Sequence, residues 1–384
     1  MSLRYLAIVP RSPLHLGRVK PAFNFLATRD ILPGSVVRGG LAEFLIRTGR
    51  TSPIKEIVKD LRISWFGPTR SEPLWPYYLP ATALQCKTAG GFASQRPRGH
   101  GVMDSLIPAV AYVELEHLGV TFPVPFRMTC GHEGCHSRME RTTGWYVKEQ
   151  AYKTVEVFRG AQTKVALSRR RRASEREMLY SVTALQPTIF VGKVWADDEV
   201  FKLLIEACQT SGIGGLTGRG YGRVEAREAF FEREPVRERV AAFNQMLARV
   251  WEELCSMTWR SEVPAQPPSW YFSIDLASPA ILRDAYGRPT LRLDLDLHGS
   301  RHTPMMFASS PSFESGWSTA WGLPKEVRLA ANLGSSYVFR VESETEEIYE
   351  FLEALEEVGV GDRRDEGYGD ALVCHPFHRE VEQV

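Results

Sequence analysis

The sequence predicts an α+β protein made of two related domains, and a repeated glycine pattern is the main observation behind this prediction. Residues 212–222 (loop one) read GIGGLTGRGYG, and residues 359–369 (loop two) read GVGDRRDEGYG. Both fit Gly-[Ile/Val]-Gly, five residues, and Gly-Tyr-Gly. Because glycine turns easily through positive φ and lets a backbone approach closely, the duplication predicts two domains that each present a glycine loop beside a sheet.

Composition and charge are those of a globular protein without a dominant charge of either sign. The chain has 384 residues, of which 43% are hydrophobic and 24% charged, and its formal net charge is +1. This length allows two or three domains with hydrophobic cores. No apolar run approaches the length of a membrane helix, and the first residues lack the long apolar centre of a signal peptide. Six cysteines in a chain of this size do not form a disulfide scaffold, so we expect a reducing, cytoplasmic location.

The N-terminal part is predicted to form a strand and a helix and then an insertion. Arg4–Val9 is a buried strand by its apolar run, and Val36–Arg47 carries apolar residues at helical spacing. Ser35 is a natural N-cap for this helix, and Arg38 in its first turn would suit an anion docked at the helix start. From 53 to 125, proline, glycine and aromatic residues dominate with little periodicity, which is typical of a loop-rich insertion.

The first copy of the repeat reads strand, helix, glycine loop and strand. Thr188–Trp195 is strand-like, and Asp197 or Asp198 then caps a helix over Glu199–Thr210. Loop one follows and leads into Arg223-Val224-Glu225, a second strand-like segment. This order is the second half of a ferredoxin-like β-α-β-β-α-β unit.

The second copy repeats the same order of elements. Ser336–Val341 is a strand, and Ser343 and Glu346 form a capping box for a helix over Glu346–Val358. Loop two comes next, and Ala371–Cys374 is the closing strand. Both copies therefore predict the same half-unit of the fold.

A helix and a linker are predicted between the two copies. Apolar residues from Val236 to Leu254 recur at steps of three or four, as in a helix with one packed face. The proline-bearing stretch Thr258–Pro268 then reads as a linker.

Loop one combines the residue types that hold single-stranded RNA. Such RNA is bound by cationic grooves along the phosphates and by flat side chains that stack on bases. The loop places Arg219 and Tyr221 among Gly218 and Gly220, with Arg223 directly after it, and glycine N–H groups can approach phosphate closely. The alternative is that the loop only closes its sheet and packs on the first helix.

A run of arginines is a second basic feature. It precedes a strand signal at Met178–Val182, as in a hairpin or arm that could extend along RNA, and consists of Arg169, Arg170, Arg171 and Arg172. The alternative is a solvated loop without a ligand.

A cluster of cysteine and histidine residues predicts a structural metal site in the insertion. Cys130, His132 and Cys135 lie within the short stretch CGHEGCH, and Cys86 is a further thiol of the same insertion. Four such ligands could hold one zinc ion tetrahedrally, with His100 as an alternative to Cys86 for completing the set. The other interpretation is a surface loop with reduced cysteines and no metal.

Catalysis has two candidates in the sequence. His15 lies in a turn after the first strand and could act as a general base in RNA cleavage, although the sequence shows no evident partner for it. Asp104, in the stretch HGVMD, could belong to a subunit that cuts target RNA, but a structural role is the simpler interpretation. No P-loop, dinucleotide fingerprint or Ser-His-Asp pattern is present.

The motifs together resemble the RAMP superfamily of CRISPR effector proteins and, more narrowly, the Cas-five-like Csx-ten subunit of type III-D complexes. The resemblance covers most of the chain and rests on the two Gly-Tyr-Gly loops and on the order of several short segments. These are Ser12-Pro13-Leu14-His15-Leu16-Gly17, Leu32-Pro33-Gly34-Ser35-Val36-Val37-Arg38-Gly39, Cys86-Lys87, His100-Gly101-Val102-Met103-Asp104, Met178-Leu179-Tyr180-Ser181, Trp321-Gly322-Leu323-Pro324-Lys325 and Gly334-Ser335.

This resemblance implies tandem ferredoxin-like (RRM-like) RAMP domains. The N-terminal domain would span 1–230 with the insertion at about 51–149, a connecting helix and linker would span 231–267, and the C-terminal domain would span 268–384. The protein would be a non-catalytic subunit at the 5′ handle of crRNA. Its partners would be crRNA, target RNA, the large polymerase-like subunit and the first backbone RAMP subunit. His15, the helix starting near Ser35 and loop one would face the RNA.

The acidic residues of loop two and a rival function both differ from what the resemblance implies. Loop two carries Asp362, Asp365 and Glu366, so we expect packing or protein contact there rather than RNA contact. The rival function is a metal-independent endoribonuclease that processes repeat RNA with His15 as general base.

Overall fold

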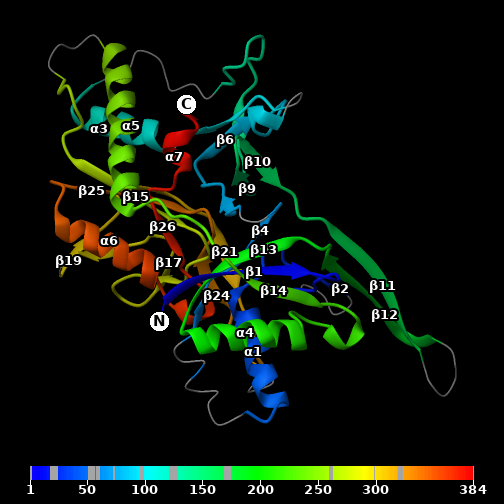
Figure 1. Cartoon of the computed structure of the whole chain (residues 1–384). Coiled ribbons are helices and arrows are strands. Elements are labelled where there is room, and N and C mark those ends of the chain that lie inside the picture. The colour runs from blue at the N-terminus through cyan, green and yellow to red at the C-terminus, as the bar shows by residue number, and fades with distance from the viewer. Residues whose placement is uncertain are drawn as a thin grey trace.

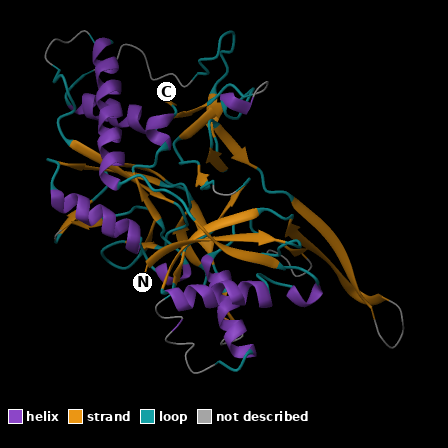
Figure 2. Ribbon diagram, viewed as in Figure 1, coloured by secondary structure: helices purple, strands orange, loops and turns teal. Residues whose placement is uncertain are grey.

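The fold described here is that of a computed structural model of the chain. It describes residues 2–17, 25–50, 57, 61–71, 74–95, 99–120, 129–167, 174–258, 263–297, 299–318 and 323–383. Two antiparallel sheets, each with a hydrophobic core, form the body of the molecule, and a smaller sheet and a long hairpin project from it (Figures 1 and 2). None of the helices in these ranges combines the length and apolarity needed to cross a membrane.

The first sheet follows the predicted order of strands and helices. Its strands lie in the order β14-β1-β13-β3, β4 also pairs with β13, and all neighbours are antiparallel. Leu6 and Ile8 of β1 pack against α1 and α4, which cover one face of the sheet (Figure 2). The bounds are β1 (Ser2–Pro10), α1 (Gly34–Arg47), β3 (Arg62–Ile63), β4 (Gly67–Thr69), β13 (Ile189–Ala196), α4 (Asp198–Ser211) and β14 (Val224–Ala229).

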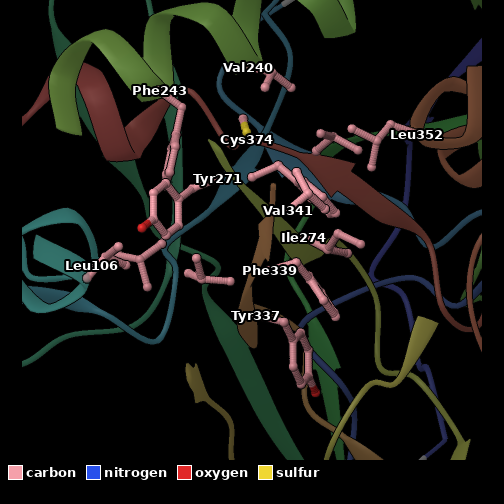
Figure 3. Close-up of a cluster of buried hydrophobic side chains, with 14 of the residues drawn as sticks. Leu106, Val240, Phe243, Tyr271, Ile274, Tyr337, Phe339, Val341, Leu352 and Cys374 are labelled. Carbon is pink, nitrogen blue, oxygen red and sulfur yellow. The ribbon is translucent and has the colours of Figure 1, made fainter. Parts of the chain in front are cut away.

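The second sheet repeats this strand order around a larger core, with β26, β15, β25 and β20 in the places of β14, β1, β13 and β3. Its strands lie in the order β20-β25-β15-β26, again antiparallel, and the rings of Phe272 and Phe339 stack at 5.4 Å between β15 and β25. Phe243 of α5 and Leu106 of α3 reach the same core (Figure 3). The bounds are α3 (Leu106–His117), α5 (Val236–Ser256), β15 (Trp270–Leu276), β20 (Met306–Ala308), β25 (Ser336–Val341), α6 (Glu346–Val358) and β26 (Ala371–Val373).

Two predicted helix caps are wrong, although the helices themselves are confirmed. Pro33, with an extended backbone, precedes the first helical residue of α1, so Ser35 lies inside the first turn and is not the N-cap. At α6 the cap is Thr345, whose hydroxyl accepts a hydrogen bond from the Ile348 N–H at 3.3 Å, and not Ser343. In both cases the helix begins where the backbone leaves the extended region, and local composition does not specify that residue.

The segment predicted as a loop-rich insertion contains more regular structure than its composition indicates. β3 and β4 belong to the first sheet, and α3 belongs to the core of the second. Strands of two to four residues are too short to show a period-two pattern, which explains the difference. The remaining strands of this region are β5 (Tyr77–Tyr78), β6 (Ala83–Cys86), β7 (Val102–Asp104), β8 (Met139–Arg141), β9 (Trp145–Lys148) and β10 (Tyr152–Val155).

The far C-terminus joins this region. β27 (Glu382–Gln383) pairs in parallel with β7, which gives a small sheet of order β27-β7-β6-β8, here called the insertion sheet. The insertion sheet is therefore completed by residues of the C-terminus.

A long hairpin leaves the body beside the first sheet. β11 (Arg159–Leu167) and β12 (Ser174–Leu185) extend away from it (Figure 1), and β2 (Phe25–Leu26) pairs in parallel with β12. The other described elements are α7 (Phe377–Glu380), three short 3-10 turns (Ala93–Gln95, Thr217–Arg219, Arg364–Glu366), β16 (Leu282–Arg283), β17 (Pro289–Thr290), β18 (Leu295–Leu297), β19 (Ser300–His302), β21 (Pro311–Glu314), β22 (Trp317–Ser318), β23 (Leu323–Pro324) and β24 (Arg328–Ala331).

Candidate nucleic-acid interface and metal centre

The two glycine loops share one backbone conformation. Each begins with a positive-φ glycine, 74° at Gly212 and 75° at Gly359, and each contains a left-handed non-glycine residue, Leu216 in one and Arg363 in the other. Each then closes through a 3-10 turn and a glycine with φ of 89° or 88°. A side chain at these glycines would be strained, so the repeated spacing reports a repeated structure.

The repeat extends to a Ser-Pro turn after the first strand of each sheet. The Ser12 hydroxyl accepts a hydrogen bond from the Arg223 N–H at 2.9 Å, and the Ser278 hydroxyl accepts one from the Asp370 N–H at the same distance. The carbonyls of the prolines that follow accept bonds from the last glycine of each loop, at 3.0 and 2.9 Å. Sequence reasoning overlooked Ser278, although the Ser-Pro pair after both strands was a usable signal.

Loop two packs against the first sheet, as its acidic residues predict. Asp365 forms an ion pair with Arg38 of α1, and the Asp370 carboxylate lies 2.8 Å from Lys193 Nζ in a buried pair. A Cβ atom at Gly367 would collide with the carbonyl of Ile63 in β3. The expectation that this loop contacts protein is confirmed, and the contact is made within the same chain.

The middle of loop one is open to solvent. Gly218 and Gly220 are exposed, and a Cβ atom at either would meet nothing within 4 Å. Arg219 and Arg223 are exposed, and within the described part of the chain neither forms an ion pair. The Arg219 guanidinium donates a hydrogen bond to the Tyr180 hydroxyl of the hairpin and lies over that ring. Loop one therefore presents two free cationic charges beside open backbone.

Tyr221 does not serve as a stacking platform. Its side chain is 5% exposed, and its hydroxyl donates a hydrogen bond to Gln162 Oε1 at 2.7 Å. Lys164 Nζ lies 4.7 Å from the ring centroid and covers the ring. A base cannot stack on a ring that is already packed, so we correct the predicted role of Tyr221: it ties loop one to the hairpin.

His15 lies beneath loop one. Its carbonyl accepts a hydrogen bond from the Gly215 N–H at 2.9 Å, and its side chain is 7% exposed. Nδ1 is 2.9 Å from the Thr183 carbonyl, and because a carbonyl only accepts, Nδ1 must carry the proton of that bond. Among the described residues this carbonyl is the only hydrogen-bond partner of the ring, which supports a positioning role.

Three other sites were predicted to contact RNA: Ser35, Arg38 and the arginine run. The start of α1 faces loop two, because Arg38 forms an ion pair with Asp365. It also packs on β3, where a Cβ atom at Gly34 would collide with the carbonyl of Ile63. Ser35 lies in the same first turn and is half-buried, and loop two contacts this helix. The arginine run Arg169–Arg172 lies outside the described residues.

A Cys3His cluster lies at one end of the insertion sheet. One ligand atom from each of Cys86, His100, Cys130 and Cys135 lies within 4.8 Å of the others. The sulfurs of Cys86 and Cys135 are 3.7 Å apart, and Cys130 Sγ is 3.5 Å from His100 Nδ1. In a tetrahedral zinc site with Zn–S of about 2.3 Å and Zn–N of about 2.0 Å, these separations are about 3.8 and 3.5 Å. The cluster could hold a metal such as zinc.

The structure replaces His132 by His100 in the predicted ligand set. His132 lies in the turn between the two cysteines, where its carbonyl accepts a hydrogen bond from the Cys135 N–H at 2.9 Å, and its ring stacks on that of His100 at 4.1 Å. Hydrogen bonds from the Ser137 backbone and side chain lower the pKa of Cys135 to about 6, whereas burial raises the pKa of Cys130 to about 11. Four protein ligands leave no open position, so the arrangement suits a structural ion.

Asp104 is part of a buried ion network rather than an open site. His378 of α7 donates from both ring nitrogens, to Asp104 Oδ2 and Asp275 Oδ1, each at 2.9 Å. Thr82 donates to Asp104 at 2.7 Å, and all four side chains of the network are buried. Burial alone would lower the pKa of His378, but Asp275 and Asp104 outweigh it and raise the pKa to about 10. The imidazolium thus joins the insertion, the second sheet and the C-terminus.

Comparison with known proteins relates the chain to one family. The sequence model described as "RAMP superfamily" matches residues 8–225. A chain of the type III-B Cmr-beta complex bound to cognate target RNA is similar to it, with a TM-score of 0.42, 13% identity and 95% of each chain covered. A chain of the same complex with AMPPnP also bound gives a TM-score of 0.41, 12% identity and coverages of 94% and 91%. A chain of the Csm3-Csm4 subcomplex in the type III-A CRISPR-Cas interference complex gives 0.37, 12%, 89% and 94%. No curated protein matches the chain.

Proposed function

The chain belongs to the RAMP superfamily, and on that premise we propose that it is a non-catalytic RNA-binding subunit of a type III CRISPR effector complex. More narrowly, it would be a Csx-ten-like subunit of a type III-D complex that holds the 5′ handle of crRNA. Its partners would be crRNA, target RNA, the large polymerase-like subunit and the first backbone RAMP subunit, in the cytoplasm. The two sheets would be tandem ferredoxin-like domains.

The difference between the two glycine loops is the observation that carries this proposal. The loops share a backbone conformation and a Ser-Pro turn, but in the described part of the chain only loop two has charged side chains held in ion pairs, those of Asp362, Asp365 and Glu366. Loop one keeps Arg219 and Arg223 exposed next to glycines without neighbours. Exposed cations beside backbone N–H groups fit the spaced negative charges of an RNA backbone.

Reversing the charges of loop one should weaken RNA binding. In the variant Arg219→Glu/Arg223→Glu we expect at least about a tenfold loss of affinity for repeat-derived RNA. The slope of log affinity against log salt should become shallower by about 1.4, because two phosphate contacts to a single strand are lost. Fluorescence anisotropy with labelled RNA over a salt series measures both quantities.

The matched control reverses two exposed cations on helix surfaces, Lys202→Glu/Arg249→Glu. It changes the net charge by the same amount and should retain most of the affinity. Equal losses in both variants would indicate a non-specific charge effect, and an unchanged affinity of the loop-one variant would contradict the proposal.

The nuclease alternative makes a different prediction for His15. If the subunit is non-catalytic, repeat RNA incubated with the purified chain in EDTA should stay intact, and His15→Ala should not change the result. Specific cuts that His15→Ala abolishes, seen on a denaturing gel, would establish the ribonuclease function instead.

We further propose that the Cys3His cluster holds one structural zinc ion. Cys86, Cys130, Cys135 and His100 would supply the four ligands. When bound, the ion would join the end of β6 to the segments that precede β7 and β8, because the ligands lie at those positions. The separations of the ligand atoms, 3.7 Å between Cys86 Sγ and Cys135 Sγ and 3.5 Å between Cys130 Sγ and His100 Nδ1, support this proposal.

A further inference from the structure

A groove lies between the insertion sheet and the second sheet. It measures about 570 Å³, within the range of ~300–1,000 Å³ that is usual for ligand sites. All three residues of β8 and all three residues of β20 line it. The start of α3 adds Ser105, Leu106 and Ala109 to the lining.

Both strands are open edges of their sheets. In the described part of the chain, β8 pairs only with β6, and β20 pairs only with β25. An edge strand presents a row of backbone N–H and C=O groups without partners, and a further strand can pair with them. At about 3.3 Å per residue, the three residues of β8 span about 10 Å, so this edge suits a short extended segment.

The side chains along the groove carry an excess of positive charge. Lys87, Arg138 and Arg141 are exposed, and within the described ranges none of them forms an ion pair. Glu140 is the one acidic residue among the described residues that line the groove. Charged side chains on an edge strand discourage pairing with a segment of like charge, so these cations select an acidic segment.

The groove also offers an apolar contact. Phe307 of β20 is 46% exposed, and its ring stacks on that of Tyr337 of β25 at 5.7 Å, which holds it in place. Met306 beside it is half-buried. Successive side chains of an extended segment point to opposite sides. A segment in which acidic and apolar residues alternate would therefore meet the cations with one set and Phe307 with the other.

A protein segment fits this groove better than RNA does. The open edges present carbonyl oxygens as well as N–H groups, and a peptide backbone supplies both donors and acceptors, whereas a phosphate only accepts. Glu140 also stands between Arg138 and Arg141 in the sequence. Its carboxylate would repel a phosphate chain that followed these cations.

We propose that this groove docks an extended acidic segment of a partner protein, which adds a strand to the free edge of β8 and places an apolar side chain against Phe307. The inference goes beyond the proposed function, because the groove lies on the insertion sheet and the second sheet and uses neither loop one nor RNA.

Binding of a labelled hexapeptide of alternating glutamate and valine to the full-length chain tests the proposal. Fluorescence anisotropy should show saturable binding, and hydrogen exchange followed by mass spectrometry should slow at Met139–Arg141 when the peptide is bound. Arg138→Glu/Arg141→Glu should weaken the binding at least about tenfold, because two attractive charges become repulsive. The control for net charge, Lys202→Glu/Arg249→Glu, should retain most of the affinity.

Two peptide controls separate backbone pairing from charge. The same peptide with N-methylated valines lacks those backbone donors, and a peptide of alternating lysine and valine has the wrong charge. Each should bind at least about tenfold more weakly. No binding of the glutamate-valine peptide, or equal binding of either control peptide, would overturn the proposal.

Further measurements exclude other causes. Melting temperatures of the variants close to that of the wild type show that a loss of binding does not come from misfolding. Binding of a uridine hexanucleotide that Arg138→Glu/Arg141→Glu abolishes, without binding of the peptide, would assign the groove to RNA instead. The variant Arg219→Glu/Arg223→Glu should still bind the peptide, so failure of this proposal and failure of the RNA-binding proposal are distinguishable.

Discussion

Removal of the metal from the Cys3His cluster is expected to melt the insertion sheet and to lower the melting temperature of the chain by about 5–10 °C, for a loss of a few kcal/mol. The apolar cluster at this end of the sheet is small and includes two of the ligands, Cys86 and Cys130, together with Leu84 and Met139. Without an ion, the four ligands would no longer hold the segments before β7 and β8. Elemental analysis should find one zinc per chain, and calorimetry with and without chelator measures the stability change.

Two histidine variants distinguish the ligand sets. His100→Gln should lose the metal and match the chelated protein in stability, whereas His132→Gln should keep the metal. Cys255→Ser, a thiol of α5 far from the cluster in sequence, serves as the thiol control and should also keep it. Metal-free protein purified without chelator, or metal lost from His132→Gln but not from His100→Gln, would contradict the assignment.

Replacing His378 by leucine should destabilise the chain by about 3–5 kcal/mol, because it leaves the carboxylates of Asp104 and Asp275 buried without their shared cation. Denaturant unfolding measures the loss. His117→Leu, at the exposed end of α3, is the matched control and should stay within about 0.5 kcal/mol of the wild type. Adding Asp104→Asn and Asp275→Asn to His378→Leu should recover part of the loss, since no buried charge then remains. A cost below about 1 kcal/mol for His378→Leu would exclude a charged network.

The same network predicts a pH dependence. Because the pKa of His378 is raised from 6.5 to about 10, its contribution is fully present below pH 6.5 and is lost as the pH rises through 10. Burial alone would raise the pKa of Asp275, but His378 outweighs it and lowers the pKa from 3.8 to about 2, so this contribution is lost only in strong acid. Burial lowers the pKa of neighbouring His375 to about 3, so the His375 side chain is neutral at pH values above about 3. The stability difference between wild type and His378→Leu should therefore be largest between about pH 4 and 6.5 and shrink toward pH 10.

Much of the fold could be predicted from local sequence patterns. β25 and α6 have the predicted bounds, and β1, β13, α4 and α5 lie where apolar periodicity indicates. β3, β4 and α3 were missed because the two strands are very short and the helix lies in a stretch dominated by turn-forming residues. Their place is set by pairing with β13 and by packing on the second core, and neither contact leaves a periodic signal.

The sequence predicted the type of each candidate site, and the structure corrected some of the residues assigned to it. The crowding of cysteine and histidine in one segment indicated a metal cluster, but His100 replaces His132 because chain geometry orients His132 into a turn. The sequence predicts Tyr221 as a stacking residue, but residues of the hairpin cover its ring. No local signal could have revealed that His378 joins Asp104, because these residues meet only when the C-terminus packs on the insertion.

By itself, the sequence determined the duplicated glycine loops, since the positive φ at Gly212 and Gly359 suits glycine wherever the chain folds. It also determined α1, α4, α5 and α6 and the strands β1, β13 and β25, because their hydrophobic pattern is a local property. Only the tertiary structure decided which loop stays open and which residues share a metal cluster, a buried charge network or a groove between two sheets. Those outcomes depend on contacts between segments far apart in the chain, and the free energy of such contacts arises only when the packed core brings them together.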